Sequence, residues 1–109
     1  LTGTRALLGQ RVVAIARIEA GTIYIYGRGV YVGDAPPPVG TMSRFGPVGV
    51  TWPAEVPTAR IELDDELGTA WGIQGIAWLT KAEFADRYHG RPVRTVPVPT
   101  RVILPALRS

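Results

Sequence analysis

The sequence predicts a mainly β protein, built as a small, strongly bent antiparallel sheet or as an SH3-like, partly open barrel, with one short helix near the C-terminus. This prediction rests on three observations: short segments in which apolar residues alternate, glycines at the ends of these segments and inside them, and a single helix-start signal. A flat α+β sandwich is the alternative. The 109 residues suffice for one modest hydrophobic core, and we expect a single domain over residues 9–99, with an N-terminal extension over 1–8.

The first strand is expected over residues 9–18, which follow a glycine turn and are apolar at both alternating sets of positions. A strand with two apolar faces is typical of the centre of a sheet. Residues 19–21 then form a turn.

Residues 21–36 alternate aliphatic residues with tyrosines on either side of Gly27-Arg28-Gly29. This pattern predicts a β-hairpin with strands 22–26 and 30–33, and with the Gly-Arg-Gly segment as its tip. The hairpin would place Tyr24, Tyr26 and Tyr31 on one surface. No helix follows the glycines, so the segment is interpreted as a turn and not as a phosphate-binding loop.

Residues 36–57 contain six prolines and three glycines, and they lose all periodicity. Because proline cannot donate to a strand ladder, we expect a long loop here. Loops of this length usually bind, cap or assemble. This one carries Arg44, Phe45 and Trp52.

Clean alternation predicts a strand over residues 59–64, an acidic turn over 65–68 and a further strand over 69–77. Gly72 and Gly75 within the last strand indicate a bulge or a close neighbour. The acidic turn lacks the spacing of a calcium loop, so it is interpreted as exposed and not as a metal site.

A helix is expected over residues 81–89. Thr80 and Glu83 have the spacing of a capping box, Leu79 and Phe84 that of a hydrophobic staple, and Gly90 is placed to end the helix. The helix is too short to be stable alone and must dock on the sheet. Its buried side is predicted to consist of Phe84, Ala85 and Tyr88.

Pro92 and Pro99 flank residues 93–98 and Pro97 lies within them, which predicts an edge strand. Residues 100–109 are expected to be a tail whose Val102, Ile103 and Leu104 dock on this chain or on a partner.

Composition excludes several chemistries. The chain has no cysteine and one histidine, so disulfides, thiolate nucleophiles, Cys-type zinc sites and sites with two histidine ligands are excluded, and no cofactor or metal is expected. The candidate acid–base groups are His89, Asp34, Glu62 and Glu83. A helix end, a turn, an exposed strand face and a capping box respectively explain them, which favours a noncatalytic role.

Four short pieces resemble a family of small uncharacterised proteins of bacteria, phages and mobile gene cassettes. They are residues 9–12, 27–34 and 57–64, and Ala70-Trp71-Gly72 with Trp78 beyond. The similarity covers roughly residues 9–96. Members often carry Cys and Glu after the Trp-Gly pair, where this chain has Ile73, Gln74, Gly75 and Ile76. The resemblance implies one compact β domain and no settled activity.

The leading hypothesis is a noncatalytic module for protein binding or self-assembly, with a homo-oligomer as the favoured form. Its expected binding residues are Tyr24, Tyr26, Tyr31, Arg44, Phe45, Trp52, Trp71 and Trp78. Nucleic-acid binding is the second hypothesis, because five arginines and no acid follow Asp86 in a chain of net charge +3. A small-molecule pocket or enzyme closed by the long loop is the third. No apolar run is long enough for a membrane helix and the first residues do not resemble a signal peptide, so we expect a cytoplasmic protein without a membrane partner.

Overall fold

The computed structural model describes residues 8–37, 42–43, 46–47, 58–73, 77–97 and 102–104; for 42–43, 46–47, 73 and 102–104 it describes the backbone alone. The elements in chain order are β1 (Arg11–Glu19), β2 (Thr22–Asp34), β3 (Met42–Ser43), β4 (Gly46–Pro47), β5 (Thr58–Leu63), β6 (Thr69–Ile73), β7 (Trp78–Thr80), α1 (Lys81–Tyr88), β8 (Val93–Thr95) and β9 (Val102–Leu104).

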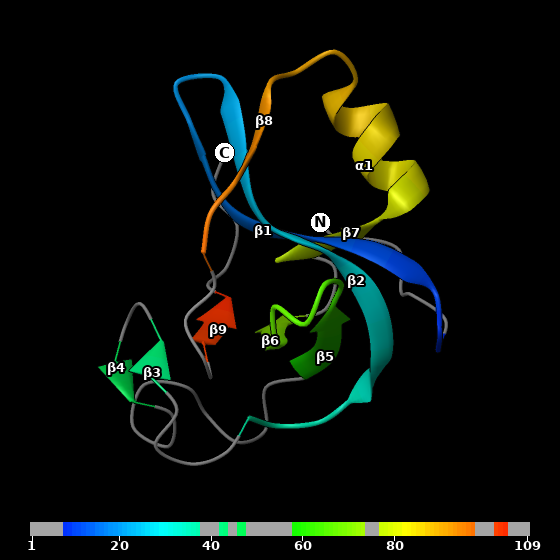
Figure 1. Ribbon diagram of the computed structural model, residues 1–109, viewed down its shortest axis with the longest axis vertical. Coiled ribbons are helices and arrows are strands. Elements are labelled where there is room, and N and C mark those ends of the chain that lie inside the picture. Colours follow the sequence, from blue (N-terminus) through cyan, green and yellow to red (C-terminus); the bar gives the residue numbers. More distant parts are fainter. Residues whose placement is uncertain are drawn as a thin grey trace.

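The strands form one bent sheet, which confirms the mainly β prediction. Its order is β4-β3-β9-β6-β5-β2-β1-β7, and β8 pairs with β2 beside this path. The longest pairings are antiparallel, whereas β9 runs parallel to β3 and β6, and β8 parallel to β2. Within the described ladder the end strands β4 and β7 do not pair, so the sheet stays open. Figure 1 shows β2 sweeping around the molecule from the β1 hairpin to β5.

The hairpin predicted around Gly27-Arg28-Gly29 is wrong, because residues 22–34 form one continuous strand. The chain reverses earlier, where Glu19 pairs with Thr22 across the two-residue turn Ala20-Gly21. Both turn residues have positive φ, 51° and 80°, which is the geometry of a type I′ turn.

The Gly-Arg-Gly segment is the point at which β2 changes its neighbour. Residues 23–25 of β2 pair with β8, and residues from Gly29 onward pair with β5. Gly27 has a φ of 149°, which side chains disfavour. A Cβ on Gly29 would lie 2.3 Å from the carbonyl oxygen of Glu62 in β5. The glycines therefore let β2 bend and let β5 approach its backbone.

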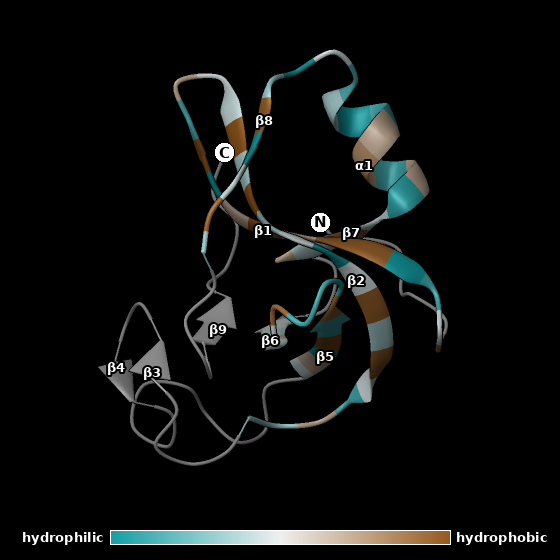
Figure 2. Ribbon diagram, in the orientation of Figure 1, coloured by the Kyte–Doolittle hydropathy of each residue, from teal (hydrophilic) through white to brown (hydrophobic). Residues whose placement is uncertain are grey.

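Two hydrophobic clusters lie on opposite faces of the sheet around β1, which is apolar on both faces as predicted. In Figure 2 the stretch of β1 beside β7 is coloured as hydrophobic. The inner cluster contains Val12, Ala14, Tyr31, Ala59, Ile61, Leu63, Ala70, Ala77 and Trp78. The helix-side cluster contains Val13, Ile15, Ile23, Ile25, Leu79 and Phe84, with Ile18 and Tyr88 packed against it. Strict alternation along β1 would put Ile18 on the face of Val12, but register shifts around Ile15 turn it to the other face.

The helix α1 begins as the sequence predicts. The Glu83 backbone N–H donates to the Thr80 hydroxyl at 3.2 Å, and the Thr80 backbone N–H donates to the Glu83 carboxylate at 3.2 Å. Gly90, with a φ of 74°, follows the C-cap residue His89. Phe84 and Tyr88 pack on the sheet, but Ala85 is exposed, contrary to the prediction, because an eight-residue helix buries only a narrow stripe.

The remaining strand predictions hold with changed limits. The strand expected over 69–77 is β6, residues 74–76 lie outside the described part, and Ala77 is a bend before β7. The loop expected over 36–57 contains the short antiparallel pair β3–β4, where Pro47 lies on an end strand that tolerates its missing N–H. Residues 102–104 dock within this chain, between β3 and β6. No helix in the described residues is long and apolar enough to cross a membrane.

Substituting Gly29→Ala tests the close approach of β2 and β5. The new Cβ would meet backbone atoms of Glu62 and Leu63, so one strand has to move. We expect a loss of about 2–3 kcal/mol in the free energy of unfolding, measured with urea. Gly90→Ala is the matched control: it has open space around it and only a positive φ, and should lose about 1 kcal/mol. Equal losses would contradict the close-approach argument.

Substituting Thr80→Val tests the capping box, because valine keeps the volume of this buried residue and removes the hydroxyl. The Glu83 N–H then loses its partner, and we expect about 1 kcal/mol less stability in urea unfolding. Thr80→Ser keeps the hydroxyl and should lose clearly less. If serine and valine cost the same, the cap does not stabilise the helix.

Candidate functional site

Tyr31 and Trp78, both expected at a binding surface, lie in the core. Tyr31 is 5% exposed and Trp78 is fully buried, and their rings stack with centroids 5.9 Å apart. The Tyr31 hydroxyl donates to the Asp34 carboxylate at the end of β2. Their role is therefore packing: together they fill the concave side of the bent sheet.

Tyr26, Trp71 and the long loop complete the predicted set. Tyr26 is half-buried and packs against the inner cluster. Trp71 is 8% exposed and lies opposite Arg60 in the β5–β6 pair. Arg44, Phe45 and Trp52 lie outside the described residues. Two buried donors, Trp78 Nε1 and Arg60 Nε, have no hydrogen-bond partner within the described part of the chain.

Among the predicted site residues that the structure describes, Tyr24 is half-buried and lies on a charged face. The register places Arg17 of β1 on one side of it and Arg94 of β8 on the other. The Arg17 guanidinium lies over the Tyr24 ring, 4.1 Å from its centroid. We call these three residues the Arg–Tyr–Arg row. Directly paired residues share a face of a sheet, so the row crosses three adjacent strands.

The charge on the Arg–Tyr–Arg row is only partly balanced. Glu19 approaches the Arg17 guanidinium at 3.8 Å, and both side chains are well exposed, so this pair is weak. Arg94 is exposed and has no ion-pair partner among the residues that the structure describes. Arg91 donates to the carbonyl oxygen of Gly21 at 3.5 Å, beside the β1–β2 turn. This arm of the sheet therefore offers a basic surface with an aromatic ring at its centre.

Sequence reasoning missed Arg17 and Arg94 as partners of Tyr24. Arg17 comes opposite Tyr24 because Ala16 is an extra residue between the paired positions Ile15 and Arg17 of β1. Arg94 lies beside Tyr24 because β8 pairs in parallel with β2, although the two residues are 70 positions apart in the sequence. The only signal in the sequence was the acid-free run of arginines after Asp86.

The acid–base candidates are not gathered in one place. Glu83 belongs to the capping box and Asp34 accepts from Tyr31, while Glu62 and His89 are exposed on β5 and at the end of α1. Within the described ranges, no three His, Asp or Glu side chains are grouped so as to hold a metal ion.

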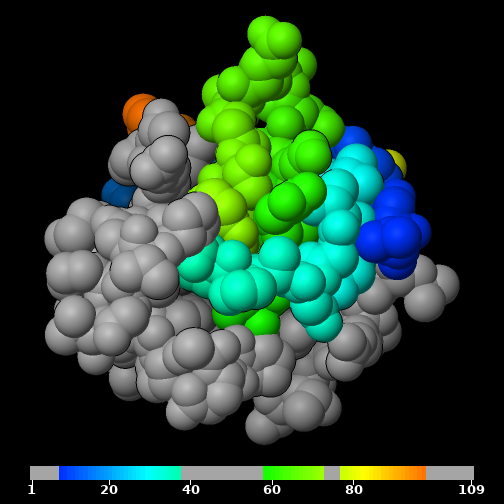
Figure 3. All heavy atoms as spheres, turned by 90° about the horizontal axis from the view of Figure 1, so that it is seen from below, coloured from blue at the N-terminus to red at the C-terminus, as the bar shows by residue number. Residues whose placement is uncertain are grey.

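An exposed ion pair joins β1 to the β5–β6 turn. Arg11 Nη1 donates to Asp64 Oδ1 at 2.8 Å, and Arg11 Nη2 donates to Asp64 Oδ2. Asp64 directly follows β5 within residues 58–73, a segment that stands out as a ridge in Figure 3. Hydrogen bonding from Arg11, with a smaller contribution from its charge, holds the pKa of Asp64 below its ordinary value of 3.8.

Comparison with protein-family models, with curated proteins and with solved structures found no match for this chain.

The Arg11–Asp64 pair predicts a defined acid dependence. Because the folded-state pKa of Asp64 is lowered, the stability that the pair contributes is present above the ordinary pKa of 3.8 and is lost as pH falls through the folded-state value. The difference in unfolding free energy between wild type and Asp64→Asn should shrink below about pH 4. Asp65→Asn, in the same turn, is the control and should show a smaller change. A difference for Asp64→Asn that stays constant with pH would contradict the pairing.

Proposed function

We propose that this chain is a noncatalytic binding module that holds a single strand of nucleic acid along the Arg–Tyr–Arg row. The observation that carries the proposal is the position of Tyr24, with the Arg17 guanidinium over its ring and Arg94 beside it in register. Aromatic rings and arginine planes are the groups on which unpaired bases stack, and guanidinium groups bind backbone phosphates.

The positions of the tyrosines favour nucleic-acid binding over self-assembly. Self-assembly through a tyrosine face loses support, because Tyr31 is in the core and Tyr26 packs against it. The large apolar side chains exposed in the described residues are Leu8, Leu67 and Val93, which lie before β1, between β5 and β6, and on β8. An apolar docking surface is therefore not favoured in that part of the molecule. Protein binding through Arg44, Phe45 and Trp52 stays a prediction.

Binding of a fluorescent single-stranded oligonucleotide, followed by anisotropy at several salt concentrations, tests the proposal. The affinity of the wild type should fall as salt rises, because cations released from the strand drive binding. Arg17→Gln with Arg94→Gln should weaken binding and lower the slope of log affinity against log salt by about 1.4, since each phosphate contact contributes about 0.7.

Further variants distinguish the contribution of the Tyr24 ring to binding from that of the arginine charges. Tyr24→Phe keeps the stacking surface and should bind like wild type, whereas Tyr24→Leu should lose about 1–3 kcal/mol of binding free energy. Arg87→Gln, in the last turn of α1, removes one positive charge away from the row and is the matched control. No binding at low salt, or an equal effect of Arg87→Gln and Arg94→Gln, would overturn the proposal.

A further inference from the structure

A second basic feature lies on the helix side of the sheet, where a hollow of about 60 Å³ opens beside the start of α1. It is lined by Arg11, Val12, Val13, Arg28 and Lys81, and we call it the basic hollow. Because one water needs roughly 10–15 Å³ by this measure, it has room for a group of about four or five heavy atoms.

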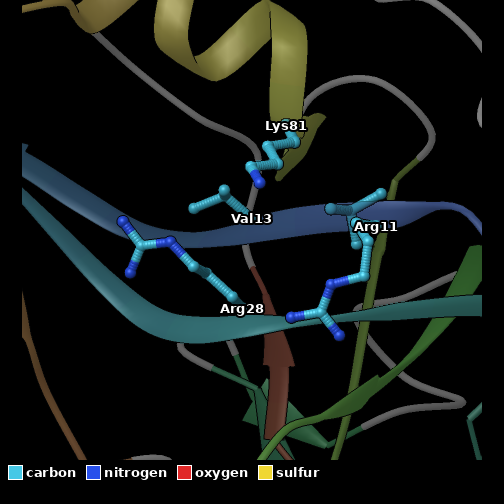
Figure 4. Close-up of a pocket in the computed structure, with 5 residues that line it drawn as sticks. Arg11, Val13, Arg28 and Lys81 are labelled. Atoms are coloured by element: carbon cyan, nitrogen blue, oxygen red, sulfur yellow. The ribbon is translucent and has the colours of Figure 1, made fainter.

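Three elements bring the cations together. Arg28 is the register partner of Val13, so the two side chains share the helix-side face of the sheet. Arg11 lies two residues before Val13 on β1 and is on the same face. Lys81 is the first residue of α1 and follows Thr80, which pairs with Val12. Figure 4 shows Lys81 reaching toward Val13, with Arg11 and Arg28 leaving neighbouring strands on either side.

The positive charge of the basic hollow is incompletely balanced. The carboxylate of Asp64 pairs with Arg11, and that of Glu83 faces the Thr80 backbone N–H at the base of the helix. Arg28 and Lys81 make no ion pair with any described residue, and both are exposed. The basic hollow is concave and is lined by two valines between the cations. Because two of its cations have no counter-charge among the described residues, it favours an anionic ligand.

We propose that the basic hollow binds a phosphate dianion, either free or carried as a monoester on a small molecule. A phosphate dianion supplies a double charge and several acceptor oxygens, so it accepts from Lys81 and Arg28 at once, with Arg11 at the rim. This site is separate from the Arg–Tyr–Arg row: Arg28 shares the face of Val13, whereas Tyr24 alternates with Ile23 and Ile25 of the helix-side cluster and so lies on the opposite face.

The test is an NMR titration of the full chain with inorganic phosphate at constant ionic strength, with chloride as the balancing anion. We expect saturable shifts of the backbone amides of Val13, Arg28 and Lys81. Arg28→Gln with Lys81→Gln should weaken the apparent affinity at least about tenfold, because two charge-assisted contacts are lost. Glycerol phosphate should bind as phosphate does, and dimethyl phosphate, a monoanion, should bind more weakly.

Two controls make the outcome specific. Arg87→Gln, on the same helix but away from the hollow, should bind phosphate like wild type. The Arg17→Gln, Arg94→Gln protein should also keep phosphate binding, so failure of the nucleic-acid proposal leaves this one standing. The inference would be overturned if phosphate shifted the amide signals no more than chloride does. It would also be overturned if the Arg28→Gln, Lys81→Gln protein, with a well-dispersed spectrum, bound phosphate with unchanged affinity.

Discussion

The close approach of β5 to Gly29 is the constraint on which the rest of the architecture depends. With no side chain at this position, the Glu62 carbonyl occupies the space that a Cβ would fill. The β5–β6 pair can then continue the sheet from the C-terminal half of β2, while β8 pairs with the N-terminal half of β2. One strand thereby serves two neighbours on the same edge. The concave side of this bend becomes the inner cluster, and the stack of Tyr31 on Trp78 fills it.

The bend of β2 also exposes a second apolar surface. Strand β1 pairs along β2 and carries apolar residues on both faces, so both faces have to be covered. The inner cluster covers one face, and α1 covers the other through Phe84 and Tyr88. The capping box sets where α1 starts, and this also fixes where Lys81 emerges beside β1. A local helix-start signal thus determines the charge at the edge of the basic hollow.

Local signals in the sequence predicted local structure well. The capping box, the clean alternation of residues 59–64 and the double apolar face of β1 each depend on neighbours within a few residues, and each was confirmed. The Gly-Arg-Gly segment was misread because a tip and a bend both require glycine, and only the distant Glu62 backbone distinguishes them. The candidate surface was missed for the same kind of reason. Arg94 meets Tyr24 through a parallel pairing, and the bulge at Ala16 decides which β1 side chain covers the ring.

The position of β9 between β6 and β3 has a consequence for the order of folding. In the described ladder, the β3–β4 pair is joined to the rest of the sheet only through residues 102–104. The β1–β2 hairpin and the β5–β6 hairpin form contacts between near neighbours in the chain, which close with little loss of loop entropy. The β3–β4 pair has no edge to join until the much later β9 segment has been synthesised and has paired with β6. During translation, residues 42–43 and 46–47 therefore cannot join the sheet until residues 102–104, which hold them in place, have been synthesised.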